Sequence, residues 1–195
     1  MMLPSGNDAA FLTAEVGGYI IQKKGLSVGV SELSEAIERK NGNFLNPYLR
    51  EMNHMAAKLC LNSSTFANPH GLNNIQNISC AEDLARLCTY AMKNHKFRKI
   101  VKTRVYNYSC LHFEKKVIEG SEEDEEETVE IITKKVNGVW ENTNKMLGEG
   151  WSGIKTGITP NAGPCLAASL YKTFSGKEYE FLVILLDSES MEARW

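Results

Sequence analysis

The chain has 195 residues, of which 43% are hydrophobic and 24% are charged, and its formal net charge is −2. This length suits one ordinary domain, or a domain with a small lobe, and the apolar fraction excludes global disorder. The balanced charge argues against a nucleic-acid partner, which normally requires a basic surplus. The longest uninterrupted apolar run, Phe181 to Leu186, is far shorter than the roughly 20 residues that span a bilayer. The N-terminal residues lack the basic and apolar regions of a signal peptide.

The cysteines and histidines predict neither a disulfide framework nor a metal site. The five cysteines are scattered, without a Cys-x-x-Cys pair, and an odd number is not typical of a disulfide-stapled fold. We therefore interpret them as small buried hydrophobic residues. The four histidines form no His-Glu-x-x-His motif, so we expect no structural metal and no cofactor.

The first half of the chain is predicted to be helical. Apolar residues recur at helical spacing over 8–24 and 47–61, and Ser31 can cap a helix that ends before Asn41. The string Ser79-Cys80-Ala81-Glu82 is a capping box, which predicts the start of a further helix that runs to about Asn94.

The second half changes to strand periodicity. Residues 102–113 alternate and are rich in Val, Tyr and Thr, and 129–136 could be the hairpin partner. The acidic block Glu119–Glu130 between them is predicted to be a solvated loop tip; an interaction segment or a cation site is the alternative. Three more strands are expected at 153–158, 165–173 and 179–187, the last two as an antiparallel meander.

The order of helices and then strands predicts an α+β fold. We expect a single domain over 1–195, with a helical lobe (1–100), a hairpin with an acidic insertion (101–140) and a sheet (141–195). Residues 188–195 are predicted to begin a helix.

Two short motifs carry the candidate chemistry. Ser5-Gly6-Asn7 lies in a turn that opens a helix, and Lys155-Thr156-Gly157 lies on a predicted strand far downstream. A Ser-x-Asn turn and a Lys-Thr-Gly strand, in this order, are the motif pair of penicillin-binding proteins and serine β-lactamases. Further strings make the chain resemble the D-alanyl-D-alanine carboxypeptidases of the S11 serine peptidase family: 52–59, 65–72, 79–84, 142–144 and 192–195.

The resemblance implies a β-lactamase/transpeptidase-like fold and removal of the terminal D-Ala of peptidoglycan stem peptides through an acyl-serine intermediate. The Lys155 ammonium suits the substrate's terminal carboxylate, and the Thr156 hydroxyl can add a hydrogen bond. Gly157 lets the substrate lie along the strand edge. Ser5 could relay a proton to the leaving amine, and Asn7 could hold the substrate's amide carbonyl.

The resemblance also implies an oxyanion-hole donor, a class of inhibitor and a location. The backbone N–H of Thr159 is the candidate donor. β-Lactams are expected to be covalent inhibitors of a longer form, and the location is expected to be extracellular or periplasmic, by export. Neither a signal peptide nor a membrane anchor is recognisable in the sequence.

The family's nucleophile is the serine of a Ser-x-x-Lys motif on a helix upstream of the Ser-x-Asn turn, and only four residues precede Ser5. The spacing recurs at Ser152–Lys155 and Ser169–Lys172, both on predicted strands, where positions i and i+3 point to opposite faces. We therefore expect a fragment of a longer protein, with no nucleophile and no hydrolytic activity. Its partial sheet should keep an exposed edge.

Two other functions stay open. One is a non-catalytic relative, a pseudoenzyme or binding module that keeps the cleft without the nucleophile. The other is a β-lactamase relative, which needs a deacylating carboxylate; Glu141 lies beside the Asn142-Thr143-Asn144 turn, but its spacing does not assign it that task. A triad built on His70 and Asp83 is not favoured, because the Gly-x-Ser-x-Gly elbow is absent.

Overall fold

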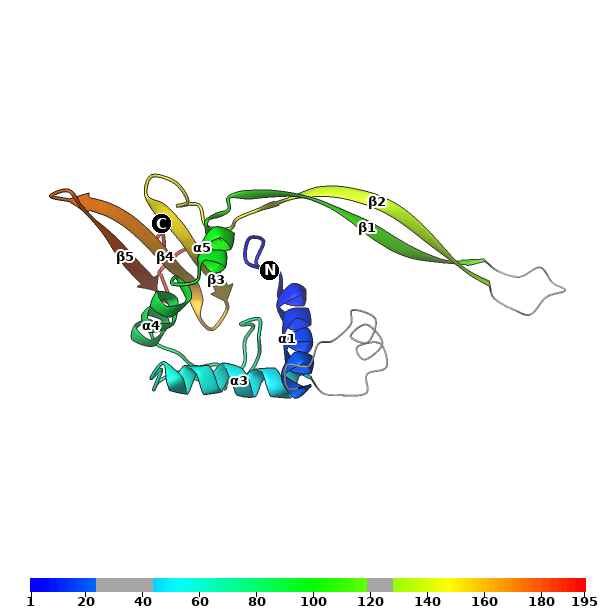
Figure 1. Cartoon of the computed structure of the whole chain (residues 1–195), viewed down its shortest axis with the longest axis horizontal. Helices are drawn as coiled ribbons and strands as arrows, with labels where there is room; N and C mark the ends of the chain where they lie inside the picture. The colour runs from blue at the N-terminus through cyan, green and yellow to red at the C-terminus, as the bar shows by residue number, and fades with distance from the viewer. Residues whose placement is uncertain (24–43, 119–127) are drawn as a thin grey trace. The chain divides into compact units, whose positions relative to one another are not determined.

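The computed structural model describes residues 1–23, 44–118 and 128–195. They form two compact units, one of residues 1–104 and 142–195 and the other of residues 105–141. The first contains helices α1, α3, α4 and α5 and strands β3, β4 and β5, and the second is the hairpin of β1 and β2 (Figure 1). The expected helix after Ser31 lies outside the described residues, as does most of the acidic block. Among the described residues, no helix is long and apolar enough to cross a membrane.

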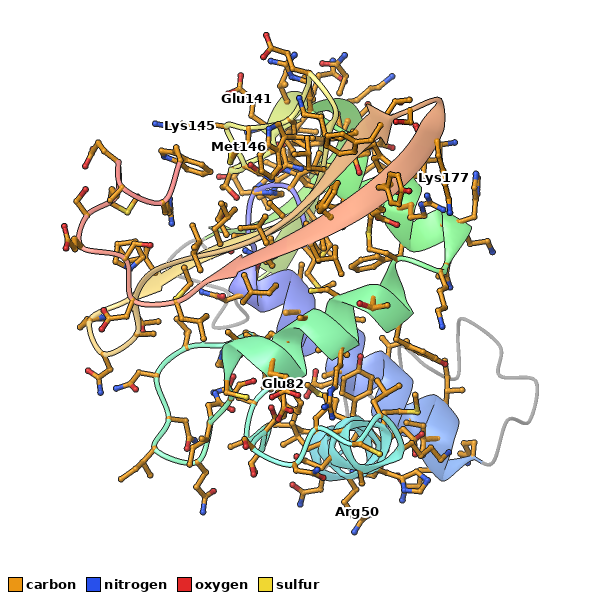
Figure 2. All side chains as sticks on the ribbon, turned by 90° about the vertical axis from the view of Figure 1, so that its left-hand side faces the viewer. Arg50, Glu82, Glu141, Lys145, Met146 and Lys177 are labelled. Atoms are coloured by element: carbon orange, nitrogen blue, oxygen red, sulfur yellow. The ribbon has the colours of Figure 1, made fainter. Side chains whose placement is uncertain are left out.

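Helices α1 (Asn7–Gln22) and α3 (Leu45–Lys58) pack closely through small residues. Ala10, Ala14 and Gly18 of α1 are buried. A Cβ at Gly18 would lie 1.7 Å from the carbonyl oxygen of Phe44, so only glycine fits where α3 begins. In Figure 2 the labelled Arg50 points outward from α3.

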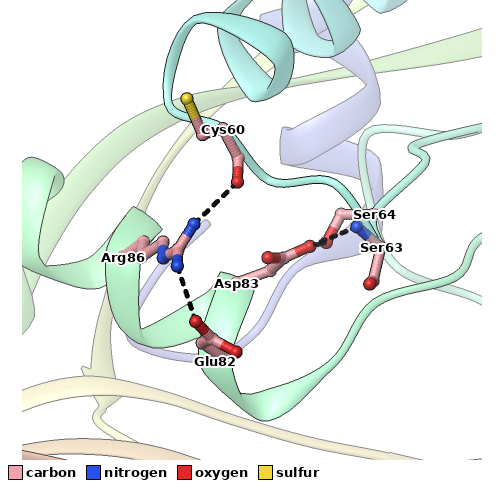
Figure 3. A network of polar contacts seen from close by, with 6 residues as sticks. All are labelled: Cys60, Ser63, Ser64, Glu82, Asp83 and Arg86. Carbon is pink, nitrogen blue, oxygen red and sulfur yellow. Dashed lines mark hydrogen bonds and ion pairs between the residues drawn. The ribbon is translucent and has the colours of Figure 1, made fainter.

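Helix α4 (Ala81–Ala91) begins where the sequence predicts, but without the predicted capping box. Cys80 is the N-cap and makes no side-chain capping bond. The Ser79 hydroxyl instead contacts the Ser64 hydroxyl at 2.8 Å. Glu82 pairs with Arg86 at 2.6 Å (Figure 3). The capping prediction was wrong because both side chains have other partners.

Asp83 is a structural residue of this region. Its carboxylate is buried and accepts hydrogen bonds of 2.8 Å from the Ser63 backbone N–H and the Ser64 hydroxyl (Figure 3). These bonds hold the loop that precedes α4 against the helix. Arg86 also holds this loop, because it donates to the Cys60 carbonyl oxygen. Among the described residues, no hydrogen bond joins Asp83 to His70, so the two do not form a triad.

Helix α5 (His95–Lys102) was not foreseen from the sequence. The Asn94 side chain accepts hydrogen bonds from the backbone N–H groups of Lys96 and Phe97, which starts a new helix. The predicted helix to Asn94 therefore ends at Ala91, and the strand that was expected from Lys102 begins at Val105.

Strands β3 (Trp151–Thr159), β4 (Gly163–Phe174) and β5 (Lys177–Leu185) form an antiparallel meander in that order. The predicted antiparallel pairing of the last two strands is confirmed. Lys177 lies at the turn between β4 and β5 (Figure 2). Helices α4 and α5 pack against the sheet around a core of Cys88, Met92, Val101 and Ile154. Within the described residues, the outer edges of β3 and β5 pair with no further strand, which agrees with the expected exposed edge.

The second unit is a two-stranded antiparallel hairpin of β1 (Val105–Ile118) and β2 (Thr128–Glu141), longer than predicted. The rings of Tyr106 and Tyr108 stack on Trp140, with centroids 6.1 and 4.5 Å away. Gly138 lies opposite Tyr108, where a Cβ would come within 2.4 Å of the Tyr108 hydroxyl.

Two further expectations are corrected. Residues 188–195 form turns rather than the start of a helix. Of the five cysteines only Cys88 is buried, while Cys60 and Cys110 are exposed, so most of them are not core residues. In the parts of the chain that the structure describes, no His, Cys, Asp and Glu side chains group as metal ligands.

Candidate active site

Ser5 and Lys155 meet although 150 positions separate them. The Lys155 Nζ donates a hydrogen bond of 2.7 Å to the Ser5 Oγ and also contacts the Thr156 carbonyl oxygen. Ser5 lies in the N-terminal turn, which the bond from the Gly6 N–H to the Met1 carbonyl closes at 3.1 Å. The structure thus brings together one side chain from each of the two motifs.

Asn7 is the first residue of α1 and is exposed. Its side chain has no hydrogen-bond partner among the described residues, so its amide can both donate and accept. It lies two residues after Ser5, at the rim of the same turn.

The loop that follows the hairpin connects the N-terminal turn to β3. Its Thr143 N–H donates to the Leu3 carbonyl oxygen at 3.1 Å, and the Thr143 hydroxyl contacts the hydroxyl of buried Thr156 at 2.6 Å. The buried Asn144 side chain donates to the Gly153 carbonyl oxygen at 2.7 Å. In the sequence, this string contributes only to the family resemblance, which assigns it no role.

Arg194 is the second cation of the site, and no motif in the sequence indicates its role. It is 6% exposed, and its Nη1 donates to the Gly157 carbonyl oxygen at 3.1 Å. Burial lowers the pKa of Lys155, and the nearby positive charge of Arg194 lowers it further. Two neighbouring cations in a partly buried site favour a bound anion.

Gly157 and Thr159 lie on β3, which is the outer strand of its sheet. One edge of β3 pairs with β4, and the other edge pairs with no further strand among the described residues. A Cβ at Gly157 would meet no atom within 4 Å, so the face of the sheet at this position is open. The Thr159 hydroxyl accepts a hydrogen bond of 3.1 Å from the Ala162 N–H. The backbone at Gly157 already accepts a hydrogen bond from Arg194, so an extended peptide along this edge would lie beside the Arg194 guanidinium.

A cavity of about 730 Å³ adjoins the end of β3. Gly157, Ile158 and Thr159 form one wall. Much of the opposite wall is the loop of residues 65–79, which Asn53 of α3 holds through two hydrogen bonds to the Phe66 backbone. Because Gly157, Ile158 and Thr159 of β3 line this space, it could accept part of a peptide bound at the strand.

Neither internal Ser-x-x-Lys string forms a nucleophile pair. Ser152–Lys155 lies on β3 and Ser169–Lys172 on β4, as expected. The Ser169 hydroxyl donates to Glu180 at 2.9 Å, and Lys155 contacts Ser5 rather than Ser152. Glu141, the candidate deacylating residue of the β-lactamase alternative, ends β2 opposite Val105.

Comparisons with known proteins identify relatives of the chain. A model of peptidase S11, described as D-alanyl-D-alanine carboxypeptidase, matches residues 33–184. A D-alanyl-D-alanine carboxypeptidase of Streptomyces sp. (strain K15) is 30% identical over 172 residues, which are 85% of this chain and 46% of that protein. This chain therefore spans about half the length of that curated relative.

Solved structures agree with this relationship. The crystal structure of the Streptomyces K15 DD-transpeptidase superposes with a TM-score of 0.63 at 29% identity, covering 99% of this chain and 60% of that one. The ampicillin-bound penicillin-binding protein D2 of Listeria monocytogenes matches with a TM-score of 0.55 at 23% identity, over 77% and 52% of the two chains. The expected α+β, transpeptidase-like fold is confirmed.

Proposed function

Because the chain belongs to the peptidase S11 family of D-alanyl-D-alanine carboxypeptidases, we propose that it forms the substrate-binding wall of such an active site. The observation that carries the proposal is the contact between Ser5 and Lys155 at 2.7 Å. The substrate is a peptide that ends in D-Ala-D-Ala, as in the stem peptides of peptidoglycan.

In this proposal, the substrate's terminal carboxylate binds at Lys155, with the charge of Arg194 nearby. An ammonium ion and a carboxylate form a charge-assisted hydrogen bond, which is stronger than a neutral one. Thr156 adds a hydroxyl group. The Thr143–Thr156 contact supports this arrangement because it fixes the position of the Thr156 side chain.

The peptide then lies as an added strand along the free edge of β3, beside Gly157. The Asn7 amide holds a carbonyl group of the peptide, and the Thr159 N–H is a donor for the developing oxyanion. Residues upstream of the D-Ala-D-Ala pair extend toward the cavity of about 730 Å³.

Ser5 carries the proton step of the proposal. Since the Lys155 ammonium donates to the Ser5 oxygen, the Ser5 hydroxyl hydrogen is available for the leaving amine. The lowered pKa of Lys155 makes proton exchange between the two groups easier than with an ordinary lysine. The acyl-forming serine is supplied from outside residues 1–195, so this chain alone is expected to bind but not to hydrolyse.

Binding to the isolated chain tests the proposal. The affinity for an N-acetylated tripeptide ending in D-Ala-D-Ala is measured by calorimetry, with the L-Ala-L-Ala peptide as the control. We expect preference for the D-isomer and a loss of about tenfold or more in Lys155→Met, since one charge-assisted bond is lost. Equal binding of both peptides, or no effect of the variant, would contradict the proposal.

Fluorescent penicillin separates the possible roles of the chain. We expect no covalent labelling of residues 1–195 and labelling of a longer product that adds a Ser-x-x-Lys helix. Labelling of the isolated chain would place the nucleophile within it. A longer product that binds the peptide but is not labelled would favour the non-catalytic binding module.

Members of the family act on peptidoglycan outside the cytoplasm. We extend this location to the present chain as part of the proposal, with β-lactams as covalent inhibitors of the longer product. The balanced net charge of −2 gives no reason to add a nucleic-acid partner.

A further inference from the structure

Helix α5 presents four basic side chains to one recess. His95, Arg98, Lys99 and Lys102 have the spacing i, i+3, i+4 and i+7, which places them on one face of the helix. They line a recess of about 460 Å³ whose other walls are Ser152, Tyr171 and Glu178. A second recess of about 400 Å³ shares Lys102 and these three residues and adds Arg104 and the turn of residues 147–151.

The recesses concentrate positive charge on a chain whose net charge is negative. Residues 93–104 contain six Lys and Arg residues and no acidic one. Four Lys and Arg side chains line the two recesses, against two carboxylates: Arg98, Lys99, Lys102 and Arg104, with Glu149 and Glu178.

Most of these cations have no partner of their own. Arg98 is engaged, because it donates to the Tyr171 hydroxyl at 2.6 Å, which in turn donates to Glu180. The side chains of Lys99, Lys102 and Arg104 make no hydrogen bond or ion pair with any residue the structure describes. Their positive charges are therefore available to a ligand.

Ser152 supplies an independent observation. It is 6% exposed and lines both recesses, but its hydroxyl has no hydrogen-bond partner among the described residues. Among the described side chains, only the Arg194 Nε is a fully buried polar atom without a partner. The Ser152 hydroxyl is therefore open to the recess that it lines, and it can donate to a ligand oxygen there.

We propose that these recesses bind a phosphate group. The available hydrogen-bond donors come from three segments of the chain. Lys99 and Lys102 lie on α5, Arg104 follows that helix, and Ser152 lies on β3. A tetrahedral phosphate has several acceptor oxygens to meet such a set, whereas a carboxylate has two in one plane. Its charge also matches an excess of cations.

This site is separate from the proposed peptide site. None of its lining residues lines the cavity of about 730 Å³, and none contacts Ser5 or Lys155 through a hydrogen bond. Lys155→Met therefore separates the two proposals: it should weaken peptide binding and leave phosphate binding unchanged.

The test is an amide NMR titration of the chain with inorganic phosphate at constant ionic strength, with chloride as the reference anion. We expect saturable shifts at Ser152, Lys102 and Arg104. Affinity should fall about tenfold in Lys102→Gln, which loses one charge-assisted bond, and should also fall in Ser152→Ala. The matched control is Lys93→Gln, which changes the net charge equally outside the recesses.

The titration is repeated with glycerol phosphate and with vesicles that contain phosphatidylglycerol. Tighter binding of one of them than of inorganic phosphate, with the same sensitivity to Lys102→Gln, assigns the source of the phosphate group. Shifts that do not saturate, or equal losses in Lys93→Gln and Lys102→Gln, would overturn the site, because they indicate screening by the bulk anion. Circular dichroism establishes that each variant is folded.

Discussion

The Nζ of Lys155 lies 2.7 Å from the Oγ of Ser5, and this bond joins β3 to the turn that begins α1. The lysine is partly buried, and the buried Arg194 raises the positive potential around it. The charged form of Lys155 is therefore disfavoured in the folded chain, although it is the form that a carboxylate ligand needs. Such opposition between stability and function is common at binding sites.

The lowered pKa of Lys155 predicts a pH-dependent stability. Between its folded pKa and its higher unfolded pKa, the unfolded chain binds more protons, so stability rises with pH in this window. At pH values below this window, Lys155 is charged in both states, and the folded chain bears the full free-energy cost of burying that charge. The free energy of unfolding of Lys155→Met should thus exceed that of the wild type most at neutral pH, and the difference should narrow as the pH rises toward 10.

Urea unfolding at several pH values measures this difference. Lys172→Met, at an exposed position of β4, is the control for removing a lysine from the same sheet. A difference for Lys155→Met that stays constant with pH would contradict the prediction.

Gly157 and Gly18 predict opposite effects of the same substitution. In Gly157→Ala the new Cβ meets no atom within 4 Å, so stability should change by less than about 0.5 kcal/mol. The methyl group would project from the sheet face and restrict the approach of a peptide bound beside Gly157, so peptide affinity should fall. In Gly18→Ala the Cβ meets the Phe44 carbonyl oxygen, which should cost about 3 kcal/mol or more.

Urea unfolding and peptide calorimetry distinguish the two effects. Unchanged peptide binding in Gly157→Ala would exclude the β3 edge as the peptide's position, whereas a large loss of stability would show that the space is not open.

The sequence predicts the elements whose local signals are strong. The meander of β4 and β5 and the strand that carries Lys155 follow from strand periodicity and turn residues. The predicted start of α4 is correct, although the capping box from which it was inferred does not form. Helix α5 was missed because its start depends on the side chain of Asn94. The residue pattern alone does not separate this short helix from the helix predicted before it and the strand predicted after it. Capping at Ser79 was wrong because a tertiary contact with Ser64 replaces the local one.

The contacts at the candidate site could be predicted only in part. The motifs indicate Ser5 and Lys155, whose contact the structure shows. Arg194 and Thr143 could not be assigned, because their roles depend on long-range contacts with Gly157 and Thr156. No local sequence pattern encodes such contacts. A short sequence shared with a protein family shows only that the segment resembles the same segment of the family's members, not which residues it contacts.

Burial of Cys88 predicts slow thiol chemistry. Burial raises the pKa of the Cys88 thiol to about 11, so at pH 8 only about one thiol in a thousand would be the reactive thiolate. Exposed Cys60 and Cys110 should be alkylated by iodoacetamide at least about 100-fold faster, because accessibility adds to the difference. Mass spectrometry of timed samples measures the three rates. If Cys88 reacts as fast as Cys60 in the folded chain, the core around α4 is not closed.

The Thr143–Thr156 contact predicts coupling between the loop after the hairpin and β3. Thr143→Val and Thr156→Val each remove one hydroxyl of a bond 2.6 Å long and leave the other without its partner. Each should cost about 1 kcal/mol of stability, and the double variant should cost less than the sum of the two.

Because we place the Thr156 hydroxyl at the substrate carboxylate, Thr143→Val should also weaken peptide binding, by disordering Thr156 rather than by removing a contact. Thr173→Val, at an exposed position near the end of β4, is the control. Additive losses of stability would show that the two hydroxyls act independently, and the loop would then have no part in positioning the site.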